Sequence, residues 1–251
     1  MMESYSLSDT GCVRQDNQDR VLADHSLGLF IVADGMGGHK HGEKAAELAI
    51  DTMKYYLESS RDRFDVTWPF GYNYELSIDA NRLSTGIQLA NRHVWNYAEQ
   101  ACEFAGMGTT IVAILLNSET AIVGNVGDSR AYLFRHGALE QVSVDDSFVN
   151  AVAPPGTSEH DLANSPMRNV LTQAAGVECT LDVHVSEMKL ESNDILLLSS
   201  DGLHGVIGDS AIRSILGSGG SVEDMAERLI AASRVNGGPD NISCVLLAYN
   251  L

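Results

Sequence analysis

Aspartates stand beside short apolar runs at four points of the sequence, each next to glycine, serine or asparagine. They are, with the neighbouring run in parentheses, Asp34 (28–33), Asp128 (120–125), Asp201 (194–199) and Asp240 (242–249). Short, β-branched apolar runs predict buried strands, and strand ends are rigid positions from which side chains can converge. Converging carboxylates would bind a hard divalent cation such as Mn²⁺ or Mg²⁺, because these ions prefer oxygen ligands.

The residues alone leave a second interpretation open. Asp-Gly and Pro-Asp-Asn are common turns, so each aspartate taken singly is also explained as a turn residue. Four such sites at strand ends favour a metal cluster, since several carboxylates at one point repel one another unless cations are present. Gly35, next to Asp34, would let the backbone turn so that its carbonyl faces an ion. Spacing alone does not decide between the two interpretations.

The elements that position these residues follow from the apolar pattern, which predicts strands in clusters and helices in pairs. Strands are expected at 20–23, 28–33, 109–116, 120–125, 131–135, 183–188, 194–199 and 242–249, and helices at 41–57, 76–104, 211–216 and 222–234. Regular alternation of strand and helix is absent, which favours an antiparallel, layered α+β fold over a parallel sheet. No change of composition marks a boundary, so we expect one domain over residues 1–251.

Composition excludes some classes of function. The 251 residues carry a formal net charge of -18, which argues against nucleic acid and anionic membranes as partners. No run reaches the roughly 18 apolar residues of a spanning helix, and the first residues lack the pattern of a signal peptide. The cysteines at 12, 102, 179 and 244 are widely spaced and are interpreted as buried free thiols. We therefore expect a cytoplasmic protein.

The ordered motifs resemble those of the metal-dependent protein phosphatase family, type 2C, in its bacterial form. The resemblance covers about residues 5 to 249 and is specific as an ordered set. The matching segments are Arg14–Asp19, Ala33–His39, Gly108–Thr110, Gly127–Arg130, Ser200–Gly202 and Gly238–Asn241.

The resemblance implies a fold and a set of ligands. The fold would be a four-layer α-β-β-α sandwich, with two mainly antiparallel sheets flanked by helix pairs. Two core Mn²⁺ or Mg²⁺ ions would be bridged by Asp34. The other ligands carried over by position are the Gly35 carbonyl on one ion, Asp201 and Asp240 on the other, Asp128 with Asp201 on a third and weaker ion, and Asp19 through water. Asn17 and Asn241 would support these ligands.

The reaction implied is hydrolysis of phosphoserine and phosphothreonine by direct attack of a water that bridges the two ions, without a phosphoenzyme. A water between two cations has its pKa lowered toward neutrality. Arg14 would hold two phosphate oxygens with its planar fork, although Arg14 taken alone is also explained as a solvated surface charge.

Two departures from the animal members of the family affect the details. Met36 stands where animal members carry a histidine proposed as the general acid, so His39 and a metal-bound water compete for that role. His39 would otherwise only shape substrate entry or pack locally. Gln18 replaces a glutamate and weakens any direct metal contact there. Arg130 is expected to brace the Asp128 turn, and the remaining histidines, which lack ligand spacing, are interpreted as surface or hydrogen-bonded interior residues.

The expected partners are phosphorylated proteins and a cognate bacterial Ser/Thr kinase, and the expected oligomeric state is a monomer. A flap is expected at about residues 146–168, beside the active site, where it would influence which phosphoproteins fit. The rival interpretations are a silent phosphatase fold that binds phosphoproteins, a plain acidic cation-binding protein, and a phosphatase acting on an anti-sigma-factor antagonist. The presence of Asp34, Asp201 and Asp240 counts against the first, and the ordered motifs count against the second. The third usually carries sensor domains, for which this sequence has no room.

Overall fold

The computed structural model describes residues 2–37, 41–61, 63, 66–100, 102–152, 165, 167 and 170–250. Two five-stranded sheets pack face to face, and every neighbouring pair of strands within them is antiparallel. The first has the order β1-β12-β11-β8-β9 and the second the order β10-β7-β6-β3-β2. Strands β4 and β5 pair with each other apart from the two large sheets.

The strands of the first sheet are β1 (Met2–Asp9), β12 (Ile242–Tyr249), β11 (Asp194–Ser199), β8 (Arg130–Arg135) and β9 (Ala138–Gln141). Those of the second are β10 (His184–Lys189), β7 (Thr120–Val126), β6 (Ile111–Asn117), β3 (Leu29–Ala33) and β2 (Arg20–Asp24). The short pair is β4 (Gly35–Met36) and β5 (Gly108–Thr109).

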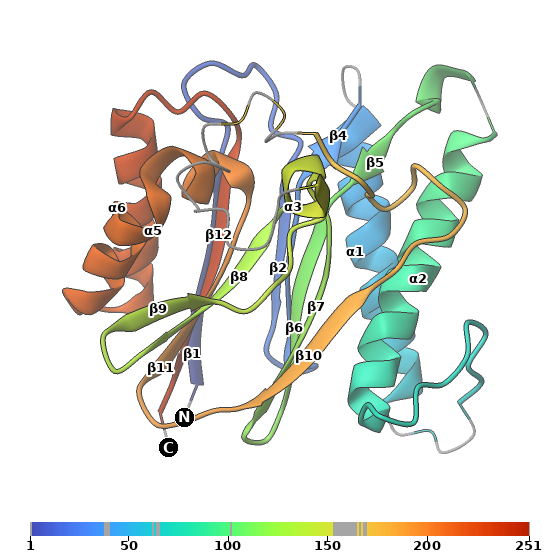
Figure 1. The fold of residues 1–251 in the computed structure, drawn as a ribbon, viewed down its shortest axis with the longest axis horizontal. Helices are drawn as coiled ribbons and strands as arrows, with labels where there is room; N and C mark the ends of the chain where they lie inside the picture. The colour runs from blue at the N-terminus through green and yellow to red at the C-terminus, as the bar shows by residue number, and fades with distance from the viewer. Residues whose placement is uncertain are drawn as a thin grey trace.

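Helices cover the outer faces of the sandwich in two pairs (Figure 1). Helices α1 (His41–Ser60) and α2 (Ile78–Ala98) cover the second sheet, and α5 (Asp201–Gly217) and α6 (Val222–Val235) cover the first. The 3-10 turn η1 (Cys102–Phe104) and the short helix α3 (Phe148–Val152) lie in connections. This arrangement confirms the predicted four-layer α+β fold.

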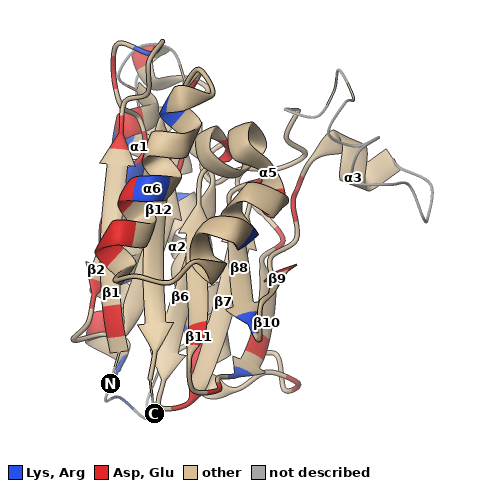
Figure 2. Cartoon of the chain, turned by 90° about the vertical axis from the view of Figure 1, so that its left-hand side faces the viewer, with Lys and Arg blue, Asp and Glu red and all other residues tan. Residues whose placement is uncertain are grey.

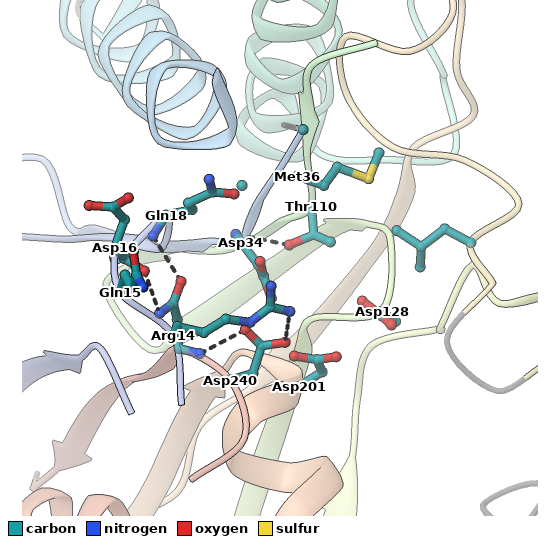
Figure 3. A pocket seen from close by; sticks show the side chains of 14 residues that line it. Arg14, Gln15, Asp16, Gln18, Asp34, Met36, Thr110, Asp128, Asp201 and Asp240 are labelled. Carbon is teal, nitrogen blue, oxygen red and sulfur yellow. Dashed lines mark hydrogen bonds and ion pairs between the residues drawn. The ribbon is translucent and has the colours of Figure 1, made fainter. Parts of the chain in front are cut away.

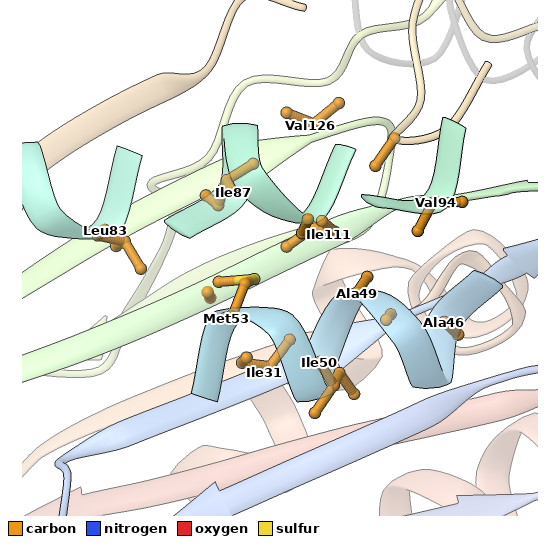
Figure 4. Packing of buried hydrophobic residues seen from close by; sticks show 14 of the residues in the cluster. Ile31, Ala46, Ala49, Ile50, Met53, Leu83, Ile87, Val94, Ile111 and Val126 are labelled. Atoms are coloured by element: carbon orange, nitrogen blue, oxygen red, sulfur yellow. The ribbon is translucent and has the colours of Figure 1, made fainter. Parts of the chain in front are cut away.

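Three apolar clusters hold the layers together, one between the sheets and one under each helix pair. Strand β3 contributes to two of them, because alternate side chains of a strand point to opposite faces. Phe30 packs between the sheets, whereas Ile31 packs under α1 and α2 with Met53 and Ile87 (Figure 4). Burial on both faces explains why the run at 28–33 is apolar without alternation.

Several elements of the structure differ from the predicted ones. Strands β1 and β9 were not expected, because their sequences lack an apolar run; β1 forms by pairing along β12, from Met2 opposite Tyr249 to Asp9 opposite Ile242. The helix predicted for 76–104 ends at Ala98 and is followed by η1. The helix predicted to begin at 211 begins at Asp201 instead and bends at Gly208, whose φ is 72°.

The interpretation of the cysteines as buried thiols holds for Cys244 only. Cys12, Cys102 and Cys179 are free and exposed, because they lie in connections rather than in the sheets. Among the described helices, none combines the length and the apolar character that crossing a bilayer requires.

Candidate metal centre

The four strand-end aspartates meet at one edge of the sandwich. Asp34 follows β3 and Asp128 follows β7 from the second sheet, while Asp201 follows β11 and Asp240 precedes β12 from the first. They surround an open cavity of about 600 Å³ (Figure 3). The cavity is also lined by Arg14, Gln15, Asp16, Gln18, Gly35, Met36, Gly37, Thr110, Leu171 and Asn241.

Burial and mutual repulsion raise the pKa values of these carboxyl groups. The pKa of Asp34 is raised well above its ordinary value, first by burial and then by the charges of Asp19 and Asp201. Burial, followed by the charge of Asp201, raises the pKa of Asp128 to about 7. The pKa of Asp201 is raised by burial and by Asp240. Such a cluster holds either protons or cations, because like charges this close do not ionise together.

Asp19 lies beneath the cluster and is 1% exposed. Its Oδ2 accepts a hydrogen bond of 2.9 Å from Ser200 Oγ, and burial raises its pKa to about 6. Among the described residues, Asp19 Oδ1 and Asp201 Oδ1 are buried without a hydrogen-bond partner. A buried carboxylate oxygen without a partner is costly, so these two atoms fit a site completed by a divalent cation.

The carboxylates surround the cavity instead of closing on a single point. In the described part of the chain, no three acidic, histidine or cysteine side chains already form a cage for one ion. Hard cations fill their remaining positions with backbone carbonyls and water. The residues present therefore fit ions that take few ligands from protein side chains and keep several bound waters.

The backbone of Asp34 is fixed by two threonines of the neighbouring segment. Asp34 O accepts hydrogen bonds from Thr109 Oγ1 and Thr110 N, both at 2.9 Å. Asp34 N donates to Thr110 Oγ1 at 3.1 Å. The sequence placed Thr109 and Thr110 in a motif without assigning them a role, because nothing in a hydroxyl's sequence position indicates which backbone group it will meet.

Gly35 is placed by a close approach of backbone and not by a turn. It belongs to β4 and pairs with Thr109, and its φ does not lie in the left-handed region. A Cβ at this position would lie 2.1 Å from Gly42 O at the start of α1. The expectation that glycine serves a turn here is therefore wrong. Only glycine lets β4 run against the first turn of α1.

Arg14 reaches the cavity from the loop after β1. Its Nη2 donates to Asp240 Oδ2 at 2.7 Å, and its side chain is 57% exposed. The hydrogen bond to Asp240 raises the pKa of Arg14 above its ordinary value. Asp240 Oδ1 accepts from the backbone of Asn241 at 2.8 Å. The structure thus brings Arg14 into the candidate site, beside an aspartate of the cluster.

The two predicted supporting asparagines hold the loop that carries Arg14 and Asp19. Asn17 Oδ1 accepts from Asp19 N at 3.0 Å. Asn241 Oδ1 accepts from Gln18 N at 2.9 Å, and its Nδ2 donates to Thr10 O and Asp16 O. Asn241 supports Asp240 only through its backbone, whereas its side chain fixes the loop.

Serine hydroxyls beneath the cluster were missed by sequence reasoning. Ser243 N donates to Ser200 Oγ at 3.0 Å, so Ser200 joins β12 to the buried Asp19. Ser200 also directly precedes α5, which begins at Asp201. The N-terminus of a helix stabilises a negative charge, which favours the ionised form of Asp201. The only sequence signal was a serine pair before Asp201.

The remaining sequence expectations have different outcomes in the structure. Arg130 does not brace Asp128 directly; its Nε and Nη2 both donate to Asp145, which folds back over β8. His39 lies outside the described residues, as does most of the expected flap at 146–168. His204 fits the expectation of a hydrogen-bonded interior histidine, since it is 6% exposed and its Nδ1 lies 3.0 Å from Ser199 Oγ.

Comparison with known proteins identifies the class. The model of the family described as protein phosphatase 2C matches residues 5–245, and this chain belongs to that family. The chain is 34% identical to the serine/threonine phosphatase stp of Listeria welshimeri, over 100% of this chain and 97% of that protein. It is therefore a protein serine/threonine phosphatase, a hydrolase acting on phosphorylated proteins.

Solved structures agree in fold, and one of them holds manganese ions. The serine/threonine phosphatase PstP/Ppp of Mycobacterium tuberculosis has a TM-score of 0.85 and 30% identity, over 100% of this chain and 99% of that one. A PstP catalytic domain in complex with two manganese ions has a TM-score of 0.83 and 28% identity, over 100% and 99% of the two chains. Membership of this metal-dependent family makes the present protein a metal-dependent bacterial phosphatase.

Proposed function

We propose that the aspartate cluster binds two core Mn²⁺ or Mg²⁺ ions and that phosphoserine and phosphothreonine are hydrolysed there by direct attack of water. The observation that carries this proposal is the pair of buried, unpartnered oxygens, Asp19 Oδ1 and Asp201 Oδ1. When bound, the ions would lower the pKa of a coordinated water and neutralise phosphate charge.

Each side chain has a proposed role in holding the ions. Asp34 would bridge the two core ions, with the Gly35 carbonyl on one and Asp201 and Asp240 on the other. Asp128, with Asp201, would hold a third and weaker ion. Asp19 would act through water, which agrees with its position beneath the cavity.

Arg14 is proposed to hold the phosphate. A guanidinium carries five N–H donors, so its contact with Asp240 uses only part of the fork. The ion pair also orients Arg14 across the cavity before substrate arrives (Figure 3). An orientation fixed in advance lowers the entropic cost of binding.

The leaving serine or threonine oxygen needs a proton, and Met36 at the cavity wall has none to give. His39 and a coordinated water are the proposed donors. A His39→Gln variant separates them: loss of the alkaline limb of the kcat pH profile assigns the proton to His39, and an unchanged profile assigns it to water.

The biological setting is also a proposal. We propose that residues 1–251 form a single cytoplasmic phosphatase domain that acts as a monomer and opposes a Ser/Thr kinase. A phosphatase that lacks a partner kinase would have no phosphoprotein to hydrolyse. Light scattering of the purified protein tests the monomer, and co-expression with the cell's Ser/Thr kinases tests the pairing.

The test of the metal centre is hydrolysis of p-nitrophenyl phosphate and a phosphothreonine peptide in Mn²⁺, Mg²⁺ and EDTA. Asp201→Asn should lower kcat/KM about 100-fold or more, because losing a metal ligand removes several kcal/mol of transition-state stabilisation. Calorimetry should show weaker Mn²⁺ binding. Asp51→Asn, an exposed change on α1, is the matched control. A folded wild type without metal-dependent release would instead support a silent phosphoprotein-binding module.

A further inference from the structure

Asp146 is hydrogen-bonded to the turn that carries Asp128. Its backbone N donates to Gly127 O at 2.9 Å, and its Oδ2 accepts from Gly127 N at 2.9 Å. Both polar backbone groups of Gly127 are thus bonded to one residue, which comes from the segment after β9. Asp146 is 8% exposed, so these bonds are shielded from water.

His184 holds the other oxygen of the same carboxylate. Its Nε2 lies 2.8 Å from Asp146 Oδ1, and a carboxylate can only accept, so the imidazole donates. His184 begins β10 and is paired with Asn125 of β7. Asn125 in turn bonds both backbone groups of Val144, at 2.6 and 3.2 Å. The histidine and the aspartate are therefore anchored to β7, the strand that leads into the Asp128 turn.

The opposite side of the turn packs against Thr110, which also fixes the backbone of Asp34. A Cβ on Gly127 would lie 2.7 Å from Thr110 Cγ2, and Thr110 bonds Asp34 through Oγ1. Ser129 Oγ lies 2.7 Å from the same Thr110 Oγ1. The turn is thus held between Thr110 on one side and Asp146 on the other.

Asp146 also positions one wall of the cavity. Its carbonyl accepts from Thr172 N at 2.8 Å, and the adjacent residues Ser147 and Leu171 form an antiparallel bridge. Leu171 lines the cavity. One residue therefore connects the Asp128 turn, the Leu171 wall and His184.

We propose that Asp146, held by His184, is a positioning residue that sets the Gly127–Asp128 turn and the Leu171 wall for catalysis. Neither side chain touches substrate; both act through the turn. This inference rests on the proposed role of Asp128 at the metal centre. The alternative is a pair that stabilises the fold without affecting the site.

The test combines a local structural readout with kinetics. In Asp146→Ala, exchange of the Gly127 amide hydrogen, followed by NMR, should be at least about 10-fold faster, and kcat/KM in Mn²⁺ should be about 10-fold lower, the usual scale for residues that orient metal ligands. His184→Ala should change both in the same direction but less. His184→Gln should restore most of the loss, because its amide N–H can donate to the same oxygen.

The matched control is His136→Ala, which removes an exposed histidine near Glu191, at the turn after β8, and should change neither readout. A Gly127 amide and a kcat/KM that stay at wild-type values in Asp146→Ala would overturn the inference. So would a loss of kcat/KM that follows global stability alone, with no added exchange at Gly127.

Failure of the proposed function gives a different pattern. A wild type without metal-dependent hydrolysis would remove the role of the site, while the Gly127 amide still reports on the Asp146 contact. If Asp128→Asn keeps full activity while Asp146→Ala loses it, coupling through the turn is overturned. Parallel losses in Asp128→Asn and Asp146→Ala would support it.

Discussion

At the scale of single residues, the site is an assembly of acids that burial keeps from ionising together. Asp34, Asp128 and Asp201 each have a raised pKa, with burial as the first cause. Protons or divalent cations relieve this repulsion, and a divalent cation does so while the carboxylates stay ionised. Among the described residues that line the cavity, Arg14 is the one with a positively charged side chain. It gives a phosphate a fixed point of attachment beside the acids.

We expect Arg14→Ala to raise KM for p-nitrophenyl phosphate about 10-fold or more, since a bidentate charged contact contributes a few kcal/mol. Arg14→Lys should recover only part of the loss, because an ammonium is a point charge without the planar fork. Steady-state kinetics at saturating Mn²⁺ measure both, with Arg92→Ala on α2 as a control. Full recovery by lysine would argue against fork-like binding.

At the scale of elements, the cluster depends on where strands and helices end. Four strands from two sheets bring one aspartate each to the same edge. Helix α5 begins at Asp201, and α1 begins against β4. Because the backbone there is fixed by sheet hydrogen bonds and by Thr109 and Thr110, the carboxylates cannot move apart to relieve their repulsion.

The contact between β4 and α1 gives a prediction for stability. Gly35→Ala should lower the free energy of unfolding by about 1–3 kcal/mol, because its Cβ would meet Gly42 O at 2.1 Å. Gly205→Ala is the matched control: it lies in α5, nothing stands within 4 Å of its Cβ, and it should gain about 0.5–1 kcal/mol. Urea unfolding in EDTA compares them. Equal stability of the Gly35 variant and the wild type would contradict the close approach.

At the scale of the whole molecule, the sandwich brings the two ends of the described chain close together and carries many acidic residues on its surface. Strands β1 and β12 lie side by side, which places Met2 opposite Tyr249. Figure 2 shows acidic residues along the strands and helices of one face, with fewer basic ones between them. The apolar clusters between the layers contain few ionisable groups, and His204 is the buried histidine among the described residues.

His204 should make the stability of the molecule depend on pH. Burial, and then the charge of Arg130, lowers the pKa of His204 well below its ordinary value of 6.5. The folded protein keeps it neutral, whereas the unfolded chain binds a proton below about pH 6.5, so its contribution to stability is lost as pH falls below that value. The slope approaches about 1.4 kcal/mol per pH unit for one group.

Thermal unfolding in EDTA from pH 8 to pH 5 tests this dependence. The wild type also contains carboxyl groups with raised pKa, such as Asp19 at about 6, which act in the opposite direction. The informative quantity is therefore the difference between wild type and His204→Gln, which should shrink as pH falls below 6.5. His136→Gln should run parallel to the wild type, and a parallel His204→Gln curve would contradict the prediction.

The sequence predicted the elements whose apolar composition indicates that they are buried. Strands β11 and β12 were placed at their observed limits, and β3 and β7 within one residue, because each is a continuous apolar run. Strand β1 was missed because its residues are only partly buried and it exists by pairing with β12. The start of α5 was missed because Gly202 and Gly205 weaken its helical pattern.

By itself, the sequence determined which residue types stand at strand ends and that Asp34, Asp128, Asp201 and Asp240 were the acids to consider. Periodicity and turn chemistry depend on residues close together in the chain, so they can be recognised from the sequence alone. Only the tertiary structure decided that Arg14 pairs with Asp240, that Arg130 pairs with Asp145, and that Asp146 and His184 hold the Asp128 turn. These contacts join segments that are not adjacent in the chain, so the partner of each charged side chain depends on how the strands and loops pack together.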